Sequence, residues 1–390
     1  MLQLIAFIMF VTVAFFLLSR SFENGLRNKK FKALSSFPLV SIMIPAYKSE
    51  SMIKETLDAV KKSDYPRKEV IVVNDSDDGT PKICRRYGCK VIQNKERRGK
   101  GHALNMAAKK AKGEFFLFLD SDTTMQKSTI RTLMKSFKGY ESEGEKIGIV
   151  APRYEARNKN KTLAKFSDME QAMHQNLLKI QMNFKSILST RGCCLLVKKQ
   201  AFLDSGGFAS TILEDGDFNA KVIGAGYRIK YEPRALVKTR EPETYKSLFR
   251  AKQRYGKGTL FCLLNHKGTY MASLQSAVCF YPMLLLLIAF ASVFVFQDPL
   301  TLALTLALST PVLYGFSATA LITSAALIAV AGALMGVNAP AAAQKSGLLG
   351  TVLPFVVIFI PIIAAAYMKG FFSGALDRIK GRPELDFSNW

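Results

Sequence analysis

The sequence predicts an α/β domain with a parallel sheet, together with helices that span a membrane. Between residues 39 and 119, four short segments that read as strands alternate with three segments of helical spacing. The last run, residues 115–119, is wholly apolar, as is typical of a strand buried on both faces of a parallel sheet. From residue 272 to 368 only Asp298 and Lys345 are charged, so this stretch can cross a hydrocarbon core of about 30 Å several times.

The first half of the chain alternates strictly between predicted strands and predicted helices. Strands are expected at residues 39–45, 70–73, 90–93 and 115–119, and helices at 51–62, 81–87 and 100–111. This alternation favours right-handed crossovers and a parallel sheet with helices on both faces.

Two later segments have apolar residues at helical spacing. In residues 163–184 lysines and polar residues stand between them, and in residues 245–264 many basic residues do. We expect the first to combine core packing with contact to the lipid surface. The second abuts the apolar stretch, so it is expected to lie in the membrane interface.

The predicted organisation has six parts. They are an N-terminal transmembrane helix at 1–19, a basic juxtamembrane linker at 20–37, the α/β domain at 38–240, interfacial amphipathic helices at 241–271, a C-terminal bundle of four spans at 272–369, and a cytoplasmic tail at 370–390. Basic residues follow both the first and the last apolar segment, whereas a cleaved signal peptide would have them first. This predicts a multi-pass protein of the cell membrane whose α/β domain faces the cytoplasm.

The chain is strongly basic, with 54 Lys and Arg against 30 Asp and Glu and a formal net charge of +24. Such a charge favours contact with membrane lipids that have anionic headgroups, and with pyrophosphate substrates. Aromatic residues are not interleaved with the basic runs as a base-stacking surface requires, so a nucleic-acid partner is not expected.

Four polar constellations follow the predicted strands, at residues 45–47, 75–80, 98–101 and 120–122. Ligands of open α/β sheets bind at the carboxyl ends of the strands. Asp120 and Asp122 form a carboxylate pair suited to a divalent cation, and a cation there can neutralise a pyrophosphate. Each constellation alone is also a common solvated turn, so it is their order that is informative.

In this order the constellations resemble glycosyltransferase family 2, the inverting nucleotide-sugar transferases with the GT-A fold. The resemblance covers residues 39 to about 258 and, with the apolar segments, is to the membrane-integrated branch. That branch includes synthases of cellulose, hyaluronan and poly-N-acetylglucosamine, and ceramide or diacylglycerol glucosyltransferases. It implies an α/β GT-A (nucleotide-diphospho-sugar transferase) domain, a UDP-sugar donor, and Mg²⁺ or Mn²⁺ as cofactor.

The resemblance also implies roles for individual residues. Those expected to bind the nucleotide sugar are Pro45, Tyr47, Asp75, Asp77, Lys100, Asp120, Ser121 and Arg254. Asp122 is expected to hold the metal, and Gly192, Cys193 and Tyr255 to contact the acceptor. Asp215, with Glu214 beside it, is expected to be the general base that an inverting displacement needs for its nucleophile. The alternative for this acidic cluster is a role in capping a helix.

Residues 251–255 correspond to the Gln-x-x-Arg-Trp motif of many processive synthases. Arg254 is kept, but Ala251 and Tyr255 replace the glutamine and the tryptophan. This departure favours transfer of one or a few sugars to a lipid or glycolipid acceptor.

Three alternatives stay open. The chain is a processive polysaccharide synthase that extends a growing glycan, a polyprenyl-phosphate sugar synthase, or a membrane sensor that binds nucleotide sugars without catalysis. The sequence does not identify the sugar.

Overall fold

The computed structural model describes residues 29, 31–94, 96–182, 187, 190–266, 269 and 360–380. The predicted N-terminal span at 1–19 and most of the predicted bundle at 272–369 lie outside these residues. Within the described residues, no helix combines the length and the hydropathy needed to cross a membrane.

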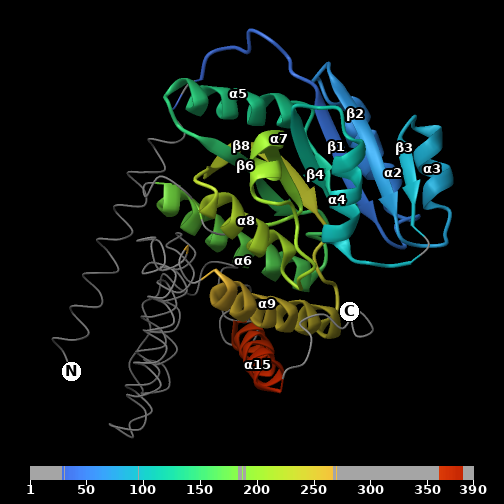
Figure 1. The fold of residues 1–390 in the computed structure, drawn as a ribbon. Coiled ribbons are helices and arrows are strands. Elements are labelled where there is room, and N and C mark those ends of the chain that lie inside the picture. Colours follow the sequence, from blue (N-terminus) through green and yellow to red (C-terminus); the bar gives the residue numbers. More distant parts are fainter. Residues whose placement is uncertain are drawn as a thin grey trace, which may run out of the picture.

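A mixed sheet of eight strands forms the centre of the described structure (Figure 1), in the order β3-β2-β1-β4-β7-β6-β8-β5. The strands are β1 (Val40–Ala46), β2 (Lys68–Asn74), β3 (Lys90–Gln93), β4 (Phe115–Leu119), β5 (Thr124–Met125), β6 (Ile147–Ala156), β7 (Cys194–Lys198) and β8 (Arg228–Thr239). β1 to β4 are mutually parallel, which confirms the prediction for the first half. β7 runs antiparallel to β4 and β6, and β5 antiparallel to β8. The prediction of parallel strands was made for the first half alone and does not extend to these strands, because apolar runs indicate burial but not strand direction.

The helices that follow the first strands lie where the sequence places them. The described helices are α2 (Ile53–Lys62), α3 (Thr80–Arg86), α4 (Lys100–Lys110), α5 (Thr129–Ser142), α6 (Thr162–Gln181), α7 (Lys199–Asp204), α8 (Glu214–Gly224), α9 (Tyr245–Asn265) and α15 (Ile360–Ile379). The two predicted amphipathic helices correspond to α6 and α9. No element was predicted at the positions of β5, α5, β6, α7 and β8.

A cluster of phenylalanines joins β4 to α7 and α8. The ring of Phe118 on β4 lies 4.9 Å from that of Phe208 and 6.1 Å from that of Phe218 on α8. Phe202 on α7 packs 5.8 Å from both Phe118 and Phe218. All four side chains are buried, and burying one phenylalanine contributes roughly 1.5–3 kcal/mol. The cluster therefore fixes the start of α8 relative to the carboxyl end of β4.

Two long helices cross at one end of the α/β domain, where α9 lies along the domain and α15 lies against α9 (Figure 1). A Cβ atom on Gly256 of α9 would overlap the carbonyl oxygen of Tyr367, and one on Gly370 of α15 would overlap that of Gln253. The two backbones are thus in direct contact, which only glycine permits. Lys257 and Asp377 form a partly buried ion pair of 2.8 Å beside the crossing.

We expect Gly256→Ala to destabilise the packing of α15 on α9. The new methyl group has no space at the backbone of Tyr367, and overpacking of this kind costs about 1–3 kcal/mol, partly offset by the better helix propensity of alanine. Thermal denaturation of the full chain, with limited proteolysis near residue 360, measures the effect. Gly374→Ala is the control, because its Cβ would meet first the side chains of Lys257 at 3.1 Å and Leu260 at 3.4 Å and not a backbone carbonyl at 2.0 Å. Equal stability of the two variants would contradict the close crossing.

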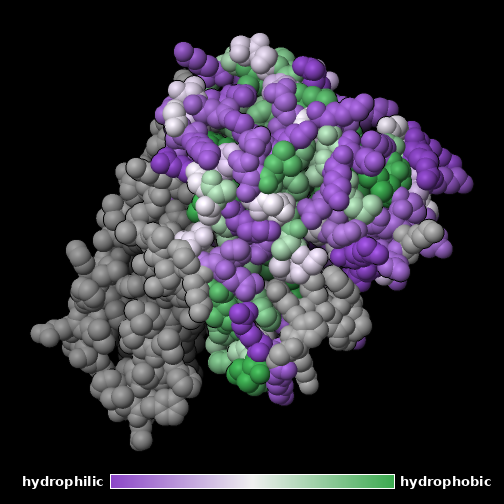
Figure 2. Space-filling model, viewed as in Figure 1, coloured by the Kyte–Doolittle hydropathy of each residue, from purple (hydrophilic) through white to green (hydrophobic). Residues whose placement is uncertain are grey.

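The face of α15 turned away from α9 is apolar and exposed. Met368, Phe372, Leu376 and Ile379 follow at helical spacing and are 38%, 58%, 54% and 81% exposed. Figure 2 shows hydrophobic atoms gathered over this helix. α15 continues through the predicted boundary between the bundle and the tail at residues 369 and 370, because a charged residue such as Lys369 does not end a helix.

Candidate active site

Two cavities meet at the carboxyl end of β4. Cavity A, of about 250 Å³, is lined by Pro45, Ala46, Tyr47, Asp75, Arg97, Gly99, Lys100, Ala103, Asp120, Ser121 and Asp122. Cavity B, of about 230 Å³, is lined by residues that include Lys100, Asp120, Asp122, Arg191, Gly192, Cys193, Leu213, Glu214, Asp215, Thr239, Arg240, Arg254 and Tyr255. The cavities share Lys100, Asp120 and Asp122, so they are two halves of one cleft.

Cavity A is built from the carboxyl ends of β1, β2 and β4. The guanidinium of Arg97 lies 4.1 Å from the centre of the Tyr47 ring. The Oδ1 atom of Asp75 accepts a 2.7 Å hydrogen bond from Asn94. Burial raises the pKa of Asp75, and the hydrogen bond from Asn94 opposes this. Cavity A therefore offers a planar ligand the aromatic face of Tyr47 and the fixed carboxylate of Asp75.

Lys100 forms the junction between the two halves. It is the first residue of α4 and follows Gly99, whose φ of 88° favours glycine. Its Nζ atom lies 2.6 Å from Oδ1 of Asp120 and 3.4 Å from Oε1 of Glu214, and it donates a 3.0 Å hydrogen bond to the carbonyl of Gly192. Burial alone would lower the pKa of Lys100, but the carboxylates of Asp120, Glu214 and Asp215 raise it well above its usual value. The ammonium group stays charged.

Asp122 lies beside Asp120 and accepts hydrogen bonds from Thr123 at 3.1 Å and Thr239 at 3.3 Å. Burial raises the pKa of Asp122, the charge of Asp120 adds to this, and Lys100 and Arg191 oppose it. A cation would relieve the repulsion between the two carboxylates. Among the described residues no group of three or more His, Cys, Asp and Glu side chains is arranged to hold a metal ion. The pair fits a site of the kind in which one or two carboxylates and substrate phosphates share a Mg²⁺ or Mn²⁺ ion.

The segment 191–193 connects the acidic groups of the cleft through its backbone. The N–H of Gly192 donates a 2.7 Å hydrogen bond to Oδ2 of Asp215, whose Oδ1 accepts one of 2.8 Å from Gly216. The N–H of Asp120 donates to the carbonyl of Cys193 at 3.0 Å. A Cβ at position 192 would lie 2.8 Å from the Cβ of Asp215, so glycine allows this approach. The carboxylate of Asp215 is therefore oriented at the first turn of α8.

The neighbouring groups Glu214 and Cys193 differ chemically from Asp215. Burial raises the pKa of Glu214, and the charge of Lys100 opposes this rise. Burial also raises the pKa of Cys193 to about 12, so this thiol stays protonated and is a poor nucleophile.

α9 supplies the remaining wall of cavity B. Ala251, Arg254 and Tyr255 of this helix line the cavity, with the guanidinium of Arg254 5.5 Å from the centre of the Tyr255 ring. Lys252 points the other way and forms an ion pair of 2.5 Å with Glu170 of α6. Gly258 allows α9 to approach Leu213, which directly precedes the acidic turn. The helix predicted to lie in the membrane interface thus also lines the candidate site.

Residues 41–206 match glycosyl transferase family 2. The chain carries a glycosyltransferase family 2 domain. This confirms the family that the motifs predict.

Two curated relatives of the family 2 domain are poly-beta-1,6-N-acetyl-D-glucosamine synthases. The protein of Staphylococcus epidermidis is 31% identical over 226 residues, which are 56% of this chain and 54% of that protein. The protein of Staphylococcus aureus (strain COL) is 29% identical over 251 residues, 63% of this chain and 60% of that protein. The matched part therefore spans less than two thirds of either relative.

One solved structure with a similar fold is the mannosyltransferase PcManGT from Pyrobaculum calidifontis in complex with GDP-Man and Mn²⁺. It superimposes with a TM-score of 0.54 at 20% sequence identity, over 98% of this chain and 100% of that one. This likeness supports the GT-A-like α/β fold of the family 2 domain.

The cleft brings together every predicted site residue except Asp77, and four of them, Glu214, Asp215, Arg254 and Tyr255, lie beyond the matched residues 41–206. Asp77 is exposed and lines neither cavity. Its neighbour Asp78 instead accepts hydrogen bonds from Ser76 and Thr80 at the start of α3, and these bonds lower its pKa despite partial burial. A run of three acidic residues in a turn does not show which of them faces the ligand.

Sequence reasoning missed four polar residues that line the cleft, namely Arg97, Arg191, Thr239 and Arg240. Arg97 adjoins the basic motif at 98–101, and Arg191 directly precedes the small residues Gly192 and Cys193. These positions are the only signal that the sequence holds for either arginine. Thr239 and Arg240 end β8, which the sequence analysis did not assign.

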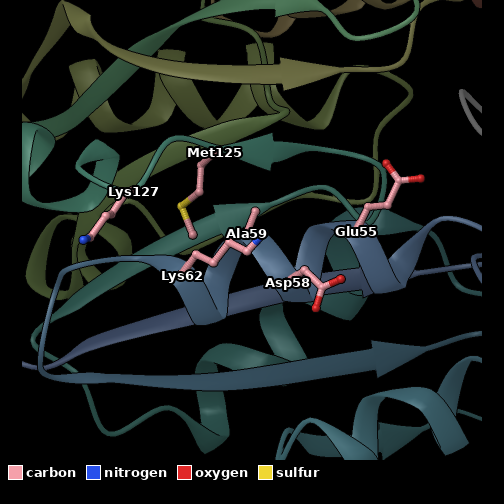
Figure 3. A pocket seen from close by; sticks show the side chains of 6 residues that line it. All are labelled: Glu55, Asp58, Ala59, Lys62, Met125 and Lys127. Atoms are coloured by element: carbon pink, nitrogen blue, oxygen red, sulfur yellow. The ribbon is translucent and has the colours of Figure 1, made fainter.

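A separate hollow of about 580 Å³ lies between α2 and β5 and is lined by Glu55, Asp58, Ala59, Lys62, Met125 and Lys127. Figure 3 shows the Met125 side chain pointing from β5 toward α2, with charged side chains around it. Glu55 is paired with Arg157 at 3.0 Å. This hollow contains none of the predicted site residues, and we assign no chemistry to it.

Proposed function

We propose that the chain is an inverting, metal-dependent membrane glycosyltransferase that moves a sugar from a UDP-sugar to a hydroxyl group of a lipid or glycolipid at the cytoplasmic face. The observation that carries this proposal is the junction at Lys100, Asp120 and Asp122. On one side lies a half suited to a nucleoside, and on the other lies a half with a carboxylate suited to general-base catalysis. A nucleotide sugar has its parts in the same order, with the nucleoside first, the diphosphate in the middle and the sugar at the other end.

In the proposed complex the nucleoside occupies cavity A. The Tyr47 ring offers a stacking surface for the base, and Asp75 accepts a hydrogen bond from it. The diphosphate then lies at the junction, where Lys100 contacts it as a positive charge. Asp122, with Asp120 beside it, would hold a Mg²⁺ or Mn²⁺ ion, which when bound neutralises charge on the diphosphate.

Asp215 is the proposed general base. Its two backbone hydrogen bonds fix the carboxylate in the wall of cavity B, where it can meet an acceptor hydroxyl that approaches the sugar from the face away from the leaving group. Tyr255 and the small residues Gly192 and Cys193 shape the surroundings of the acceptor. One base and one charge-neutralising site are what a single displacement with inversion needs.

The exposed apolar face of α15 supports an acceptor that is presented at a membrane surface. α15 packs on α9, and α9 lines the acceptor half of the cleft. Lys369, Arg378 and Lys380 accompany the apolar stripe, as is typical of a helix lying on anionic lipid. The apolar stretch outside the described residues is consistent with the same location.

The proposal is tested by release of the nucleoside diphosphate from the detergent-purified full chain, with and without membrane lipid. UDP is measured for UDP-GlcNAc, UDP-glucose and UDP-galactose as donors, and GDP for GDP-mannose. UDP-GlcNAc comes first, because both named relatives are N-acetylglucosamine polymer synthases. We expect one donor to be turned over, and lipid to increase the rate. If the chain binds UDP tightly but turns over none of the donors, the result would favour the alternative of a membrane sensor that binds nucleotide sugars without catalysis.

Removal of divalent metal is expected to lower transfer by about 10²-fold or more, because the charge of the diphosphate is then not neutralised. UDP release after EDTA treatment and after readdition of Mn²⁺ or Mg²⁺ measures this effect. Asp122→Asn is expected to need more metal for half-maximal rate. Full activity without metal would contradict the role of the carboxylate pair.

A processive polysaccharide synthase is the second candidate, and the two synthase relatives favour it. The replacement of two motif residues by Ala251 and Tyr255 favours short transfer instead. Size analysis of the radiolabelled product decides between them, since a long polymer excludes the lipid product and a single glycolipid excludes the polymer.

A further inference from the structure

Arg191 is the least exposed of the three arginines that line cavity B. Its side chain is 18% exposed, compared with 42% for Arg240, and Arg254 is also an exposed residue. Its Nη1 atom is paired with Glu241, whose side chain is only 4% exposed. Arg191 therefore has a fixed place in the wall of the cleft.

The pair of Arg191 and Glu241 is held from two further sides. The side chain of Asn158 donates a 2.9 Å hydrogen bond to the carbonyl of Glu241 and accepts one of 3.0 Å from its N–H. The ring of Tyr154 lies 5.4 Å from the guanidinium of Arg191. These contacts orient the guanidinium before any ligand is present.

Arg191 borders the part of the cleft that the end of a diphosphate must reach. It lines cavity B together with Asp122 of the junction and Tyr255 of α9. A donor with its nucleoside in cavity A and its sugar before Asp215 passes its second phosphate through this region. Glu241 is the one hydrogen-bond partner that the described residues offer to the guanidinium, which has five N–H donors.

Neutralising the charge of Glu241 does not by itself explain why Arg191 lies in the wall of the cleft. A buried ion pair gains little stability over apolar packing, and an arginine needed for folding alone has no reason to line the cleft while its partner Glu241 does not. A guanidinium held on one side by a carboxylate presents its other N–H groups in a plane that matches two phosphate oxygens.

We propose that Arg191 binds the sugar-bearing phosphate of the donor and that Glu241 is the residue that positions it. The inference rests on the proposed function. As the bond from the anomeric carbon to the phosphate oxygen breaks, its electron pair goes to that oxygen. The acceptor oxygen forms the new bond and its proton goes to Asp215. Arg191 stabilises the growing negative charge by hydrogen bonds and transfers no proton.

The test compares the affinities of UDP and UMP, because UMP lacks the second phosphate. We expect Arg191→Gln to weaken UDP binding about tenfold or more, to leave UMP binding unchanged, and to lower kcat by about 10²-fold. Arg191→Lys should recover part of both effects. Glu241→Gln should shift the ratio of UDP to UMP affinity in the same direction but less, since it changes only the orientation of Arg191.

Arg228→Gln is the control, because it removes an Arg–Glu pair of 3.0 Å with Glu145 that lies outside both cavities. This variant should leave the ratio of UDP to UMP affinity and the kcat unchanged. Equal weakening of UDP and UMP, or a change in the KM of the acceptor alone, would overturn the inference while leaving the proposed function intact. A wild-type chain that neither binds UDP nor turns over a nucleotide sugar would overturn both.

Discussion

Replacing Asp215 with asparagine is expected to lower sugar transfer by about 10²- to 10⁴-fold and to leave UDP binding nearly unchanged. Asparagine has nearly the same shape, and its one side-chain oxygen can still accept the hydrogen bond from Gly192, while the bond from Gly216 to the other oxygen is lost. It cannot take a proton from an acceptor hydroxyl. Because Asp215 lines cavity B and not cavity A, the nucleoside half is not disturbed. Single-turnover transfer and titration with UDP separate the two effects.

Asp204→Asn is the matched control for this prediction. Asp204 is exposed and accepts hydrogen bonds from Tyr227 and Gln200, at 2.7 Å each, outside the cleft. Its replacement should leave transfer unchanged. Glu214→Gln is the more demanding comparison, because Glu214 borders the same cavity but is engaged by Lys100. If Glu214→Gln abolished transfer and Asp215→Asn did not, the assignment of the base would be wrong.

Strands and site residues could be predicted from the sequence where they follow one another directly along the chain. β1 to β4 are short apolar runs, each followed by its polar residues, so the strands and the shared position of Asp75, Lys100 and Asp120 could be predicted together. The phenylalanines of β4 also identified it as a buried central strand. Asp215 was found only through the family resemblance, since an acidic first turn of a helix is common without any catalytic role.

The rest depends on contacts between residues far apart in the chain, which have no local pattern. Glu241 follows Arg191 by 50 residues, so the pair could not be read from either segment. Gly256 meets Tyr367 across the apolar stretch, and neither residue predicts the other. The amphipathic pattern of α9 showed two faces but not that one of them covers a cleft. The direction of β7 likewise follows from where the chain re-enters the sheet.

Lys100→Met is expected to lower transfer by about 10²-fold or more and to weaken UDP binding, because the junction loses the charge that faces the diphosphate. Methionine keeps much of the length of the side chain, so the packing changes little. The variant should also lose about 1–3 kcal/mol of stability at neutral pH, less than for a fully buried pair, since Lys100 is 28% exposed.

The loss of stability in Lys100→Met should depend on pH in a defined direction. Burial already raises the pKa of Glu214, and the charge of Lys100 opposes this, so the variant raises it further. The folded state then binds a proton that the unfolded state releases at its usual pKa of about 4.3. The wild type shares the unfolded state, so stability relative to the wild type should fall as the pH rises from the folded pKa of Glu214 in the wild type toward the higher one in the variant, and be nearly restored below both. Denaturant unfolding at pH 4, 5 and 7.5 measures this. Lys198→Met, which removes a pair of 2.6 Å with Glu141 outside the cleft, should leave transfer unchanged. A Lys100→Met variant equally destabilised at every pH would show that Lys100 acts there through packing and not through its charge.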